Sequence, residues 1–471
     1  MKTLLLYFTV ALYFLSFTAA QATHIKGGYI THKADKDNPL KYHFELYVYK
    51  DRGSSVDDPS VTINFSGTNL APNTSISVLK YSYTDLGGED TALNIYKWEY
   101  TFPGAGTFNV TWNGINRNPY ILNVSSPSDQ LSFLVKTTLI IPSSNTANNG
   151  IRFEAPTTAT AYVGKPFKHN LRTYETDGDI LVYKFVTPLC FGPGYSIGVP
   201  NYSLPPGISI NKFGEINWPS PQVRGEYVVA VLVEEYKNNE LVAQTIYDFQ
   251  IIVQESNKEP RATLVKKDRY KYTTDGMIIA TPNQRLKLEF FVSESSGKTP
   301  KVPQLYSEFQ LDHIRNFTSQ TVTHRDSANG KVLEVVFTPA PDLVRNQPYI
   351  IGTKSAVDKY TTSSLYLYEI TNWDYAYIQV ASTLLSVSDL KDEIDAKVYP
   401  NPVSDKIFIE KIKQKNVELQ IWNVMGQQVV VTTLNEGKNI IKRPRHLPSG
   451  TYFYYIISNG RRIKAGKLFF D

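Results

Sequence analysis

Short runs of alternating apolar and polar residues, each ended by Gly or Pro, are the feature that most constrains how this chain can fold. Phe44, Leu46 and Val48 alternate with Glu45, Tyr47 and Tyr49, and Ile407 and Ile409 repeat the pattern near the end of the sequence. A period of two places every second side chain on one face of a β-strand. The chain has 32 Tyr, 23 Phe, 27 Gly and 27 Pro and no sustained amphipathic helical pattern, so we expect an all-β protein.

Length and linker composition divide the chain into a string of Ig-like β-sandwich domains. About 450 residues follow the N-terminal apolar segment, which is enough for three or four domains. The predicted units are an N-terminal β domain at 22–141, an Ig-like domain at 151–254, a third β-sandwich at 260–382 and a small C-terminal sandwich at 397–471.

Residues 1–20 have the pattern of a secretory signal peptide. Lys2 precedes an apolar run from Leu4 to Phe17, and small residues follow it. The run is too short for a membrane span, and no later window contains 18 consecutive apolar residues. We therefore expect Sec-dependent entry into the periplasm and no transmembrane segment in the mature chain.

Positive charge is concentrated at the C-terminal end. Residues 397–471 contain thirteen Lys and Arg against five Asp and Glu, a net charge of +8, whereas the whole chain carries +5, so the remainder carries −3. The basic balance therefore does not predict a nucleic-acid partner for the rest of the protein. Cys190 is the single cysteine, so no intrachain disulfide can form, and we expect it to be a small buried residue.

The segment 397–471 carries the most specific motifs. Two prolines around an Asn set a stiff start, and Asn459-Gly460 favours a tight hairpin. In order and spacing the segment resembles the C-terminal sorting domain of the type IX secretion system of Bacteroidetes. The residues that carry the resemblance are Tyr399, Pro400, Asn401, Pro402, Met425, Gly426, Leu447, Pro448, Gly450, Thr451, Tyr452, Gly466 and Lys467.

That resemblance implies recognition by the type IX secretion machinery and transport across the outer membrane. In the family the domain is commonly removed, and the product is released or attached to surface lipopolysaccharide. The alternative is an ordinary terminal Ig-like sandwich with no sorting role.

Two further segments resemble domains of bacterial surface proteins. The start of the first domain, Ala-Thr-His-Ile-Lys-Gly-Gly at 22–28, resembles the opening domain of large adhesion-like or gliding-associated Bacteroidetes proteins. Residues 151–254, with an acidic turn at 175–179 and Leu-Pro-Pro-Gly at 204–207, resemble a cadherin-like or PKD-like Ig domain. His24, His32 and His43 are widely spaced, which favours packing or surface roles over a metal site.

The acidic turn supplies the candidate metal ligands. Glu175, Asp177 and Asp179 alternate along an extended segment, and Gly178 permits a tight turn. Calcium takes six to eight oxygens, so three carboxylates could begin a Ca²⁺ site but could not complete it. The alternative is a polar turn whose Asp side chains bond to their own backbone.

We assign no catalytic residue and expect that the protein is not an enzyme. Gly194-Tyr195-Ser196-Ile197-Gly198 matches a nucleophile elbow, but Pro193 and Pro200 flank it and neither side has helical periodicity. The sequence favours a noncatalytic adhesion or binding protein, secreted or on the outer cell surface. Its exposed tyrosines could contact a glycan or a protein. The alternatives are a secreted hydrolase of polysaccharide or peptide with an unrecognised site, and a structural spacer.

Overall fold

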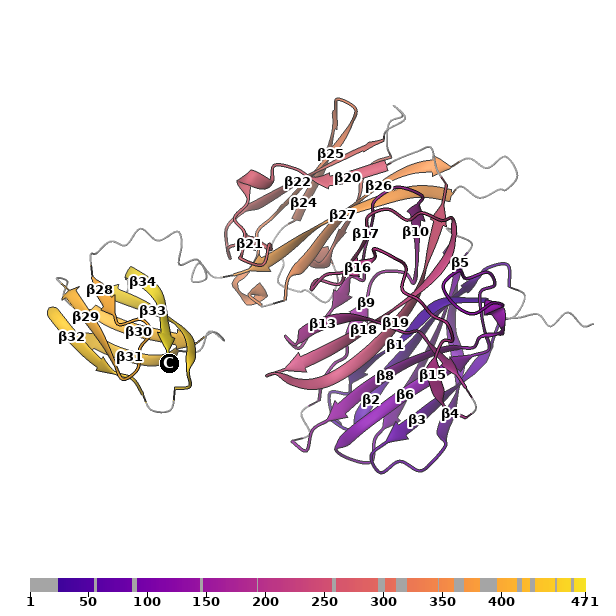
Figure 1. Cartoon of the computed structure of the whole chain (residues 1–471), viewed down its shortest axis with the longest axis horizontal. Coiled ribbons are helices and arrows are strands. Elements are labelled where there is room, and N and C mark those ends of the chain that lie inside the picture. Colours follow the sequence, from indigo (N-terminus) through magenta and orange to yellow (C-terminus); the bar gives the residue numbers. More distant parts are fainter. Residues whose placement is uncertain are drawn as a thin grey trace, which may run out of the picture. The chain divides into compact units, whose positions relative to one another are not determined.

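The computed structural model describes residues 24–381 and 396–471, except 55–56, 87–90, 145–146, 193, 256–259, 295–300, 311–319, 346, 360–367, 413–416, 424–427, 445–446 and 459–460. The predicted signal peptide therefore lies outside the described residues. The described chain is built from β-strands and four short 3₁₀ turns, which confirms the all-β prediction (Figure 1). Among these residues, no helix has the length and apolar character needed to cross a membrane.

The chain forms two compact units, residues 1–380 and 381–471. The first unit contains three hydrophobic cores, and the second contains one of its own.

The first segment forms a curled sheet in the order β1-β2-β5-β4-β3-β6-β8. Its elements are β1 (His24–Ala34), β2 (Lys41–Asp51), β3 (Ser60–Gly67), β4 (Thr74–Asp85), β5 (Thr91–Thr101), β6 (Gly106–Gly114), β7 (Asn116–Arg117), η1 (Ser128–Gln130) and β8 (Phe133–Ile141). Alternate side chains of these strands, including Phe44, Leu46, Phe108 and Trp112, make up the first core.

The second segment packs its core between the continuation of this sheet and a small sheet β11-β17-β16. Its strands are β9 (Arg152–Phe153), β10 (Thr158–Tyr162), β11 (Phe167–Asn170), β12 (Thr173–Tyr174), β13 (Ile180–Val186), β14 (Leu189–Phe191), β15 (Ser196–Gly198), β16 (Ser209–Ile210), β17 (Glu215–Trp218), β18 (Gly225–Lys237) and β19 (Glu240–Gln254).

The prediction of a separate domain at 22–141 needs correction, because β19 joins the first two segments. One edge of β19 pairs with β18 along its whole length. The other edge pairs with β8 near Thr245, with β1 at Asp248 and with β10 beyond it. Both edge strands of the first sheet therefore pair with β19, which lies about 100 residues after β8 and more than 200 residues after β1, and this strand closes the sheet.

Close contacts of β1 with β19 and with β2 explain the Gly-Gly pair that the sequence places near the start of β1. A Cβ atom on Gly27 would lie 2.5 Å from the Asp248 carbonyl oxygen and 2.6 Å from the Thr157 hydroxyl. A Cβ atom on Gly28 would lie 2.6 Å from the Tyr47 carbonyl oxygen. Only glycine leaves room for these strands to approach so closely.

A buried ion pair lies at the same junction. Arg117 donates from Nη1 to Asp248 Oδ1 at 3.1 Å and from Nη2 to Oδ2 at 2.6 Å, and both side chains are fully buried. Arg117 also donates to the carbonyl of Leu189 and stacks on Phe133. The pair therefore connects β7, β14, β8 and β19 around one bidentate contact.

The third segment is a sandwich of two four-stranded sheets, β20-β22-β25-β24 and β21-β27-β26-β23, with its own core between them. Its elements are β20 (Pro260–Leu264), η2 (Lys267–Arg269), β21 (Ile278–Ala280), β22 (Leu286–Glu294), β23 (Gln304–Ser307), η3 (Glu308–Gln310), β24 (Gln320–Ser327), β25 (Gly330–Phe337), η4 (Pro341–Leu343), β26 (Tyr349–Lys359) and β27 (Tyr368–Val380).

Polar and aromatic contacts join the third segment to the second. Lys168 Nζ lies 2.6 Å from Asp374 Oδ1, and Tyr377 donates to Glu215 at 2.6 Å. The Tyr377 ring also stacks on Phe213, with 4.3 Å between centroids. These contacts place the second and third segments in one compact unit despite their separate cores.

The second unit is a seven-stranded sandwich with sheets β28-β29-β32 and β31-β30-β33-β34. Its strands are β28 (Lys397–Tyr399), β29 (Lys406–Ile412), β30 (Val417–Asn423), β31 (Gln428–Leu434), β32 (Gly437–Lys442), β33 (Gly450–Ser458) and β34 (Arg461–Phe470). Inward-facing residues such as Ile407, Ile409, Leu419 and Ile421 are fully buried, as their alternation predicts.

We expect Gly27→Ala to destabilise the first unit by about 1–3 kcal/mol, because the added methyl group would force β1 and β19 apart. Gly104→Ala is the matched control, since nothing lies within 4 Å of a Cβ at that position. Urea unfolding of both variants measures the difference. Equal stability of the two variants would contradict the proposed steric role of Gly27.

Candidate functional site

Three acidic side chains meet inside the second segment. Glu175 and Asp179 lie on either side of the turn between β12 and β13, and Glu235 lies on β18 opposite Leu181 of β13. One carboxylate oxygen from each residue lies within 4.8 Å of the other two, and all three residues are buried. We refer to Glu175, Asp179 and Glu235 as the carboxylate cluster.

Glu175 organises the turn through its own side chain. Its Oε1 accepts from the backbone N–H of Asp177 at 2.5 Å, and its Oε2 accepts from Gly178 at 2.6 Å and from Asp179 at 2.9 Å. Gly178 has φ = +80°, which allows the chain to reverse so that three successive N–H groups face one carboxylate.

Asp179 and Glu235 have no such partners. Their side chains are 1% and 0% exposed, and none of the four carboxylate oxygens accepts a hydrogen bond from the described residues. The N–H of Ile151 is close enough to lower the pKa of Glu235, yet it does not reach hydrogen-bonding geometry. Buried polar groups in folded proteins almost always have a partner, so these four oxygens need an explanation.

Burial and mutual repulsion raise the pKa of all three acids. The pKa of Glu175 rises to about 7, mainly through burial and further through Asp179 and Asp177. Burial, with Glu175 and Asp179 nearby, raises the pKa of Glu235 well above its usual value. Burial also raises the pKa of Asp179, although Lys237 opposes it. Two like charges 4.8 Å apart repel by about 3–4 kcal/mol at an effective dielectric constant near 20.

The sequence prediction identified two of the three members of the cluster. Asp177 instead faces Asn149, whose backbone and side-chain N–H groups donate to its two oxygens at 2.7 Å each. Glu235 was missed, although a signal for it existed. Val229, Val231 and Val233 alternate into the second core, and the same period directs Glu235 to that face.

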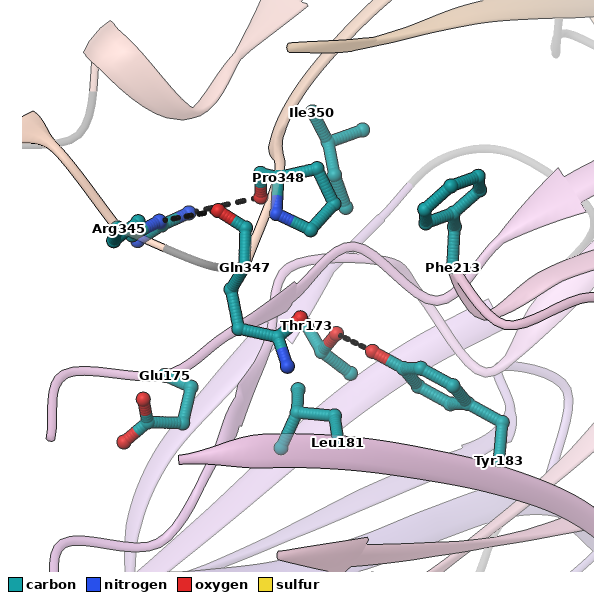
Figure 2. Close-up of a pocket in the computed structure, with 9 residues that line it drawn as sticks. All are labelled: Thr173, Glu175, Leu181, Tyr183, Phe213, Arg345, Gln347, Pro348 and Ile350. Atoms are coloured by element: carbon teal, nitrogen blue, oxygen red, sulfur yellow. Dashed lines mark hydrogen bonds between the residues drawn. The ribbon is translucent and has the colours of Figure 1, made fainter. Parts of the chain in front are cut away.

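A small pocket borders the cluster on the side of the third segment. Figure 2 shows its lining, in which Gln347 lies above Thr173 and Leu181, and the Glu175 carboxylate points away from it. Gln347 donates to the Asp179 carbonyl oxygen at 3.2 Å, and Arg345 forms an ion pair with the buried Glu308. The described residues of the third segment therefore contact the backbone of the acidic turn, and none of them forms an ion pair with its carboxylates.

The other candidate functional residues within the described part of the chain lie in packing or polar contacts that do not form a site. His32 is buried against Tyr42 and Phe44, and burial lowers its pKa to about 4. His43 contacts Asp35 and Glu99 at a partly exposed position. Ser196 begins a strand in the hairpin formed by β14 and β15 and does not open a helix, and Cys190 is buried beside it.

The predicted sorting residues bring the two ends of the second unit together. Asn401 donates from Nδ2 to the Lys467 carbonyl at 3.0 Å and accepts from the Phe469 N–H at 2.7 Å. Tyr399 stacks on Phe408, and the peptide bonds before Pro400 and Pro402 are both cis.

The later motif residues pack on the same closing strand. Tyr452 donates to the Pro448 carbonyl at 2.9 Å, and its ring lies 4.5 Å from that of Phe470. Leu447 is buried, and a Cβ on Gly466 would lie 2.5 Å from the Tyr454 ring. Gly450 has φ = +147°, and Thr451 is exposed on β33. Met425 and Gly426 lie outside the described residues.

Comparison with known proteins identifies the second unit. Residues 397–469 match the family model described as "Secretion system C-terminal sorting domain". This match confirms the sequence prediction of a type IX sorting domain and shows an exported protein, located at the cell surface or secreted. No curated protein matches the chain.

Several solved structures share a general likeness with the chain. The Sidekick-1 immunoglobulin domains 1–4 are 10% identical, with 94% of this chain and 98% of that chain covered and a TM-score of 0.17. Drosophila OTK extracellular domains 3–5 are 9% identical, with coverages of 77% and 99% and a TM-score of 0.16. The BSP domain of a biofilm associated protein is 10% identical, with coverages of 97% and 98% and a TM-score of 0.14. At these scores the likeness adds nothing to the sheet topology described above.

We expect the carboxylate cluster to destabilise the metal-free protein as pH rises. An acid whose folded pKa is raised favours the folded state below its unfolded pKa, and that stability is lost as pH rises through the folded value. For Glu175 the window runs from its ordinary value of 4.5 to about 7, which corresponds to about 3 kcal/mol.

The test compares the free energy of unfolding of Glu235→Gln with that of the wild type, both with a chelator present. We expect the variant to be more stable than the wild type, and by a larger margin at pH 8 than at pH 5, because the repulsion among the three wild-type carboxylates grows as they ionise. Asp177→Asn is the control, and because Asp177 contributes the smallest of the repulsions that raise the pKa of Glu175 and Glu235, its gain should grow less with pH than that of Glu235→Gln. A Glu235→Gln effect that is independent of pH would contradict the proposed repulsion.

Proposed function

We propose that this chain, which carries a type IX secretion sorting domain at residues 397–469, is a noncatalytic binding or adhesion protein of the cell surface. The observation that carries the proposal is the combination of that domain with a body made of β-sandwich layers. The body presents the ligand-binding surface, and the C-terminal unit directs it through the secretion machinery.

An exposed row of one leucine and two tyrosines on β4 is the surface that best fits such a role. Leu79, Tyr81 and Tyr83 are 76%, 67% and 48% exposed, in a strand whose opposite face contributes Val78 to the first core. Lys97 lies 4.3 Å from the centre of the Tyr81 ring. Tyrosine rings offer apolar area and a hydroxyl at low entropic cost, which suits stacking on a sugar or contact with a protein.

A noncatalytic role is supported by the position of the acids. Within the part of the chain that the structure describes, the group of three acids that converge is buried and crowded, whereas a glycosidase needs two carboxyl groups about 5–10 Å apart on either side of a bound sugar. A secreted hydrolase and a structural spacer are the competing functions, and the binding experiment below separates both from the proposed one.

The route to the surface is proposed to begin with the signal peptide at 1–20 and to continue through the periplasm. The second unit then docks on the secretion machinery. Its described basic residues Lys397, Lys406, Lys438, Lys442 and Lys467 are exposed, which suits contact with an acidic transporter or with lipopolysaccharide. Attachment to lipopolysaccharide after removal of the domain is part of this proposal.

We expect a chain that ends at residue 396 to accumulate in the periplasm of a type IX-competent host, while the full chain reaches the surface or the medium. A reporter protein fused to residues 381–471 is the complementary variant, because those residues form a compact unit with their own core. Fractionation and immunoblotting measure both. Export of the truncated chain, or retention of the fused reporter, would contradict a sorting role for this unit.

We expect Tyr81→Ala to weaken glycan binding by the full chain by about three- to tenfold, the loss of one aromatic contact. Binding is measured first on a glycan array and then by titration of the captured glycan. Tyr272→Ala is the matched control, because Tyr272 is also exposed but lies in the third segment. Hydrolysis of an array glycan would favour the enzyme alternative, and absence of any captured glycan would count against a glycan-binding surface.

A further inference from the structure

We propose that Glu175, Asp179 and Glu235 bind one calcium ion inside the second segment. Their carboxylate oxygens converge within 4.8 Å of one another, although Glu235 comes from β18 and the other two come from the turn between β12 and β13. The four oxygens of Asp179 and Glu235 are buried and accept no hydrogen bond from the described residues. A cation at this point would supply the partner that these oxygens lack.

The described neighbours do not supply that positive charge. No Lys or Arg of the described residues forms an ion pair with a member of the cluster, and the nearby Lys237 influences Asp179 only at longer range. Arg345 is occupied by Glu308, and Asp177 adds a further negative charge beside the cluster. Three buried acids facing one point without a basic residue are the surroundings of a bound cation rather than of an ion pair.

The donor set selects a hard cation. All ligands are carboxylate oxygens, with no Cys or His in the cluster, which excludes the soft ligands that zinc and copper prefer. Glu175 has about one lone pair left after its three N–H bonds, and Asp179 and Glu235 offer four carboxylate oxygens that have no partner among the described residues. With one to three waters the coordination number reaches the six to eight of calcium, whose flexible geometry tolerates such a mixed set.

The turn geometry prepares the site. The three backbone N–H groups fix the Glu175 carboxylate in place, and the Gln347 contact to the Asp179 carbonyl fixes the other side of the turn. Glu235 is fixed by its position on β18, where its neighbours Val233 and Val231 are in the core. An exported protein meets the extracellular calcium concentrations at which weak sites of this kind fill.

The test uses the full chain after removal of metal with a chelator. Isothermal titration with CaCl₂ at pH 7 should show one site with a dissociation constant between about 0.1 and 1 mM, the range of extracellular calcium modules. Because calcium must displace protons from the cluster, the observed heat should differ between buffers of different ionisation enthalpy. Thermal unfolding should shift upward with calcium.

The variants separate a calcium site from a merely buried acidic cluster. Glu235→Gln should weaken calcium binding at least tenfold and abolish the thermal shift, while in chelator it should be as stable as the wild type or more so. Asp177→Asn changes a carboxylate in the same turn that faces Asn149, so it should keep the wild-type calcium affinity within about threefold. This pair of results is not expected from misfolding, which would lower stability in chelator as well.

Three outcomes would overturn the proposal. One is that neither the heat nor the unfolding temperature responds to calcium, which would leave the cluster neutralised by protons alone. Another is a response to MgCl₂ at the same concentration with none to calcium, which would assign the site to a smaller cation. The third is loss of calcium binding in Asp177→Asn with retention in Glu235→Gln, which would place the ion elsewhere in the turn.

Discussion

The first unit depends on one edge of β19, the edge that does not pair with β18. Two strands far apart in the sequence, β1 and β8, need a partner for their outer edges, and β19 provides it to both. The approach is close enough that Gly27 faces the Asp248 carbonyl with no room for a side chain. Because β19 pairs with both edge strands of the first sheet and also belongs to the second core, the first two segments are expected to fold as one cooperative unit. That is why a boundary drawn between 141 and 151 does not separate two domains.

The same region shows two different solutions to burying charge. Arg117 forms a bidentate ion pair with Asp248 and donates to both of its carboxylate oxygens. Arg117 also donates a further N–H to the carbonyl oxygen of Leu189. The carboxylate cluster contains only acids, and its members are kept together by strand geometry rather than by attraction. Removing a carboxylate from water without a partner costs several kcal/mol, so the cluster must be neutralised by protons or by a cation. The first arrangement stabilises the fold by itself, whereas the second depends on what the surroundings supply.

The second unit is closed by contacts between its beginning and its end. Asn401 bonds to the backbone at Lys467 and Phe469, and Tyr452 packs on Phe470. Motif residues that are distant in the sequence are therefore neighbours in space, and several of them contribute to the stability of the small sandwich. A secretion machinery that recognises this unit would meet a folded surface rather than a linear signal. The unit has a hydrophobic core of its own, so its fold does not depend on the core residues of the first unit.

The sequence by itself determined the local structure and the sorting domain. Alternation such as Ile407 with Ile409 and the Gly and Pro turns predicted strands, because side-chain direction has a period of two wherever one face is buried. The sorting residues were recognisable because they lie within one segment of 75 residues, where their order and spacing can be read directly from the sequence. Only the tertiary structure decided that β19 closes the first sheet, that Asp177 faces Asn149 and that Glu235 completes the acidic cluster. Strand pairing across a hundred residues leaves no local trace, because the pairing energy is in the backbone and any extended segment can supply it.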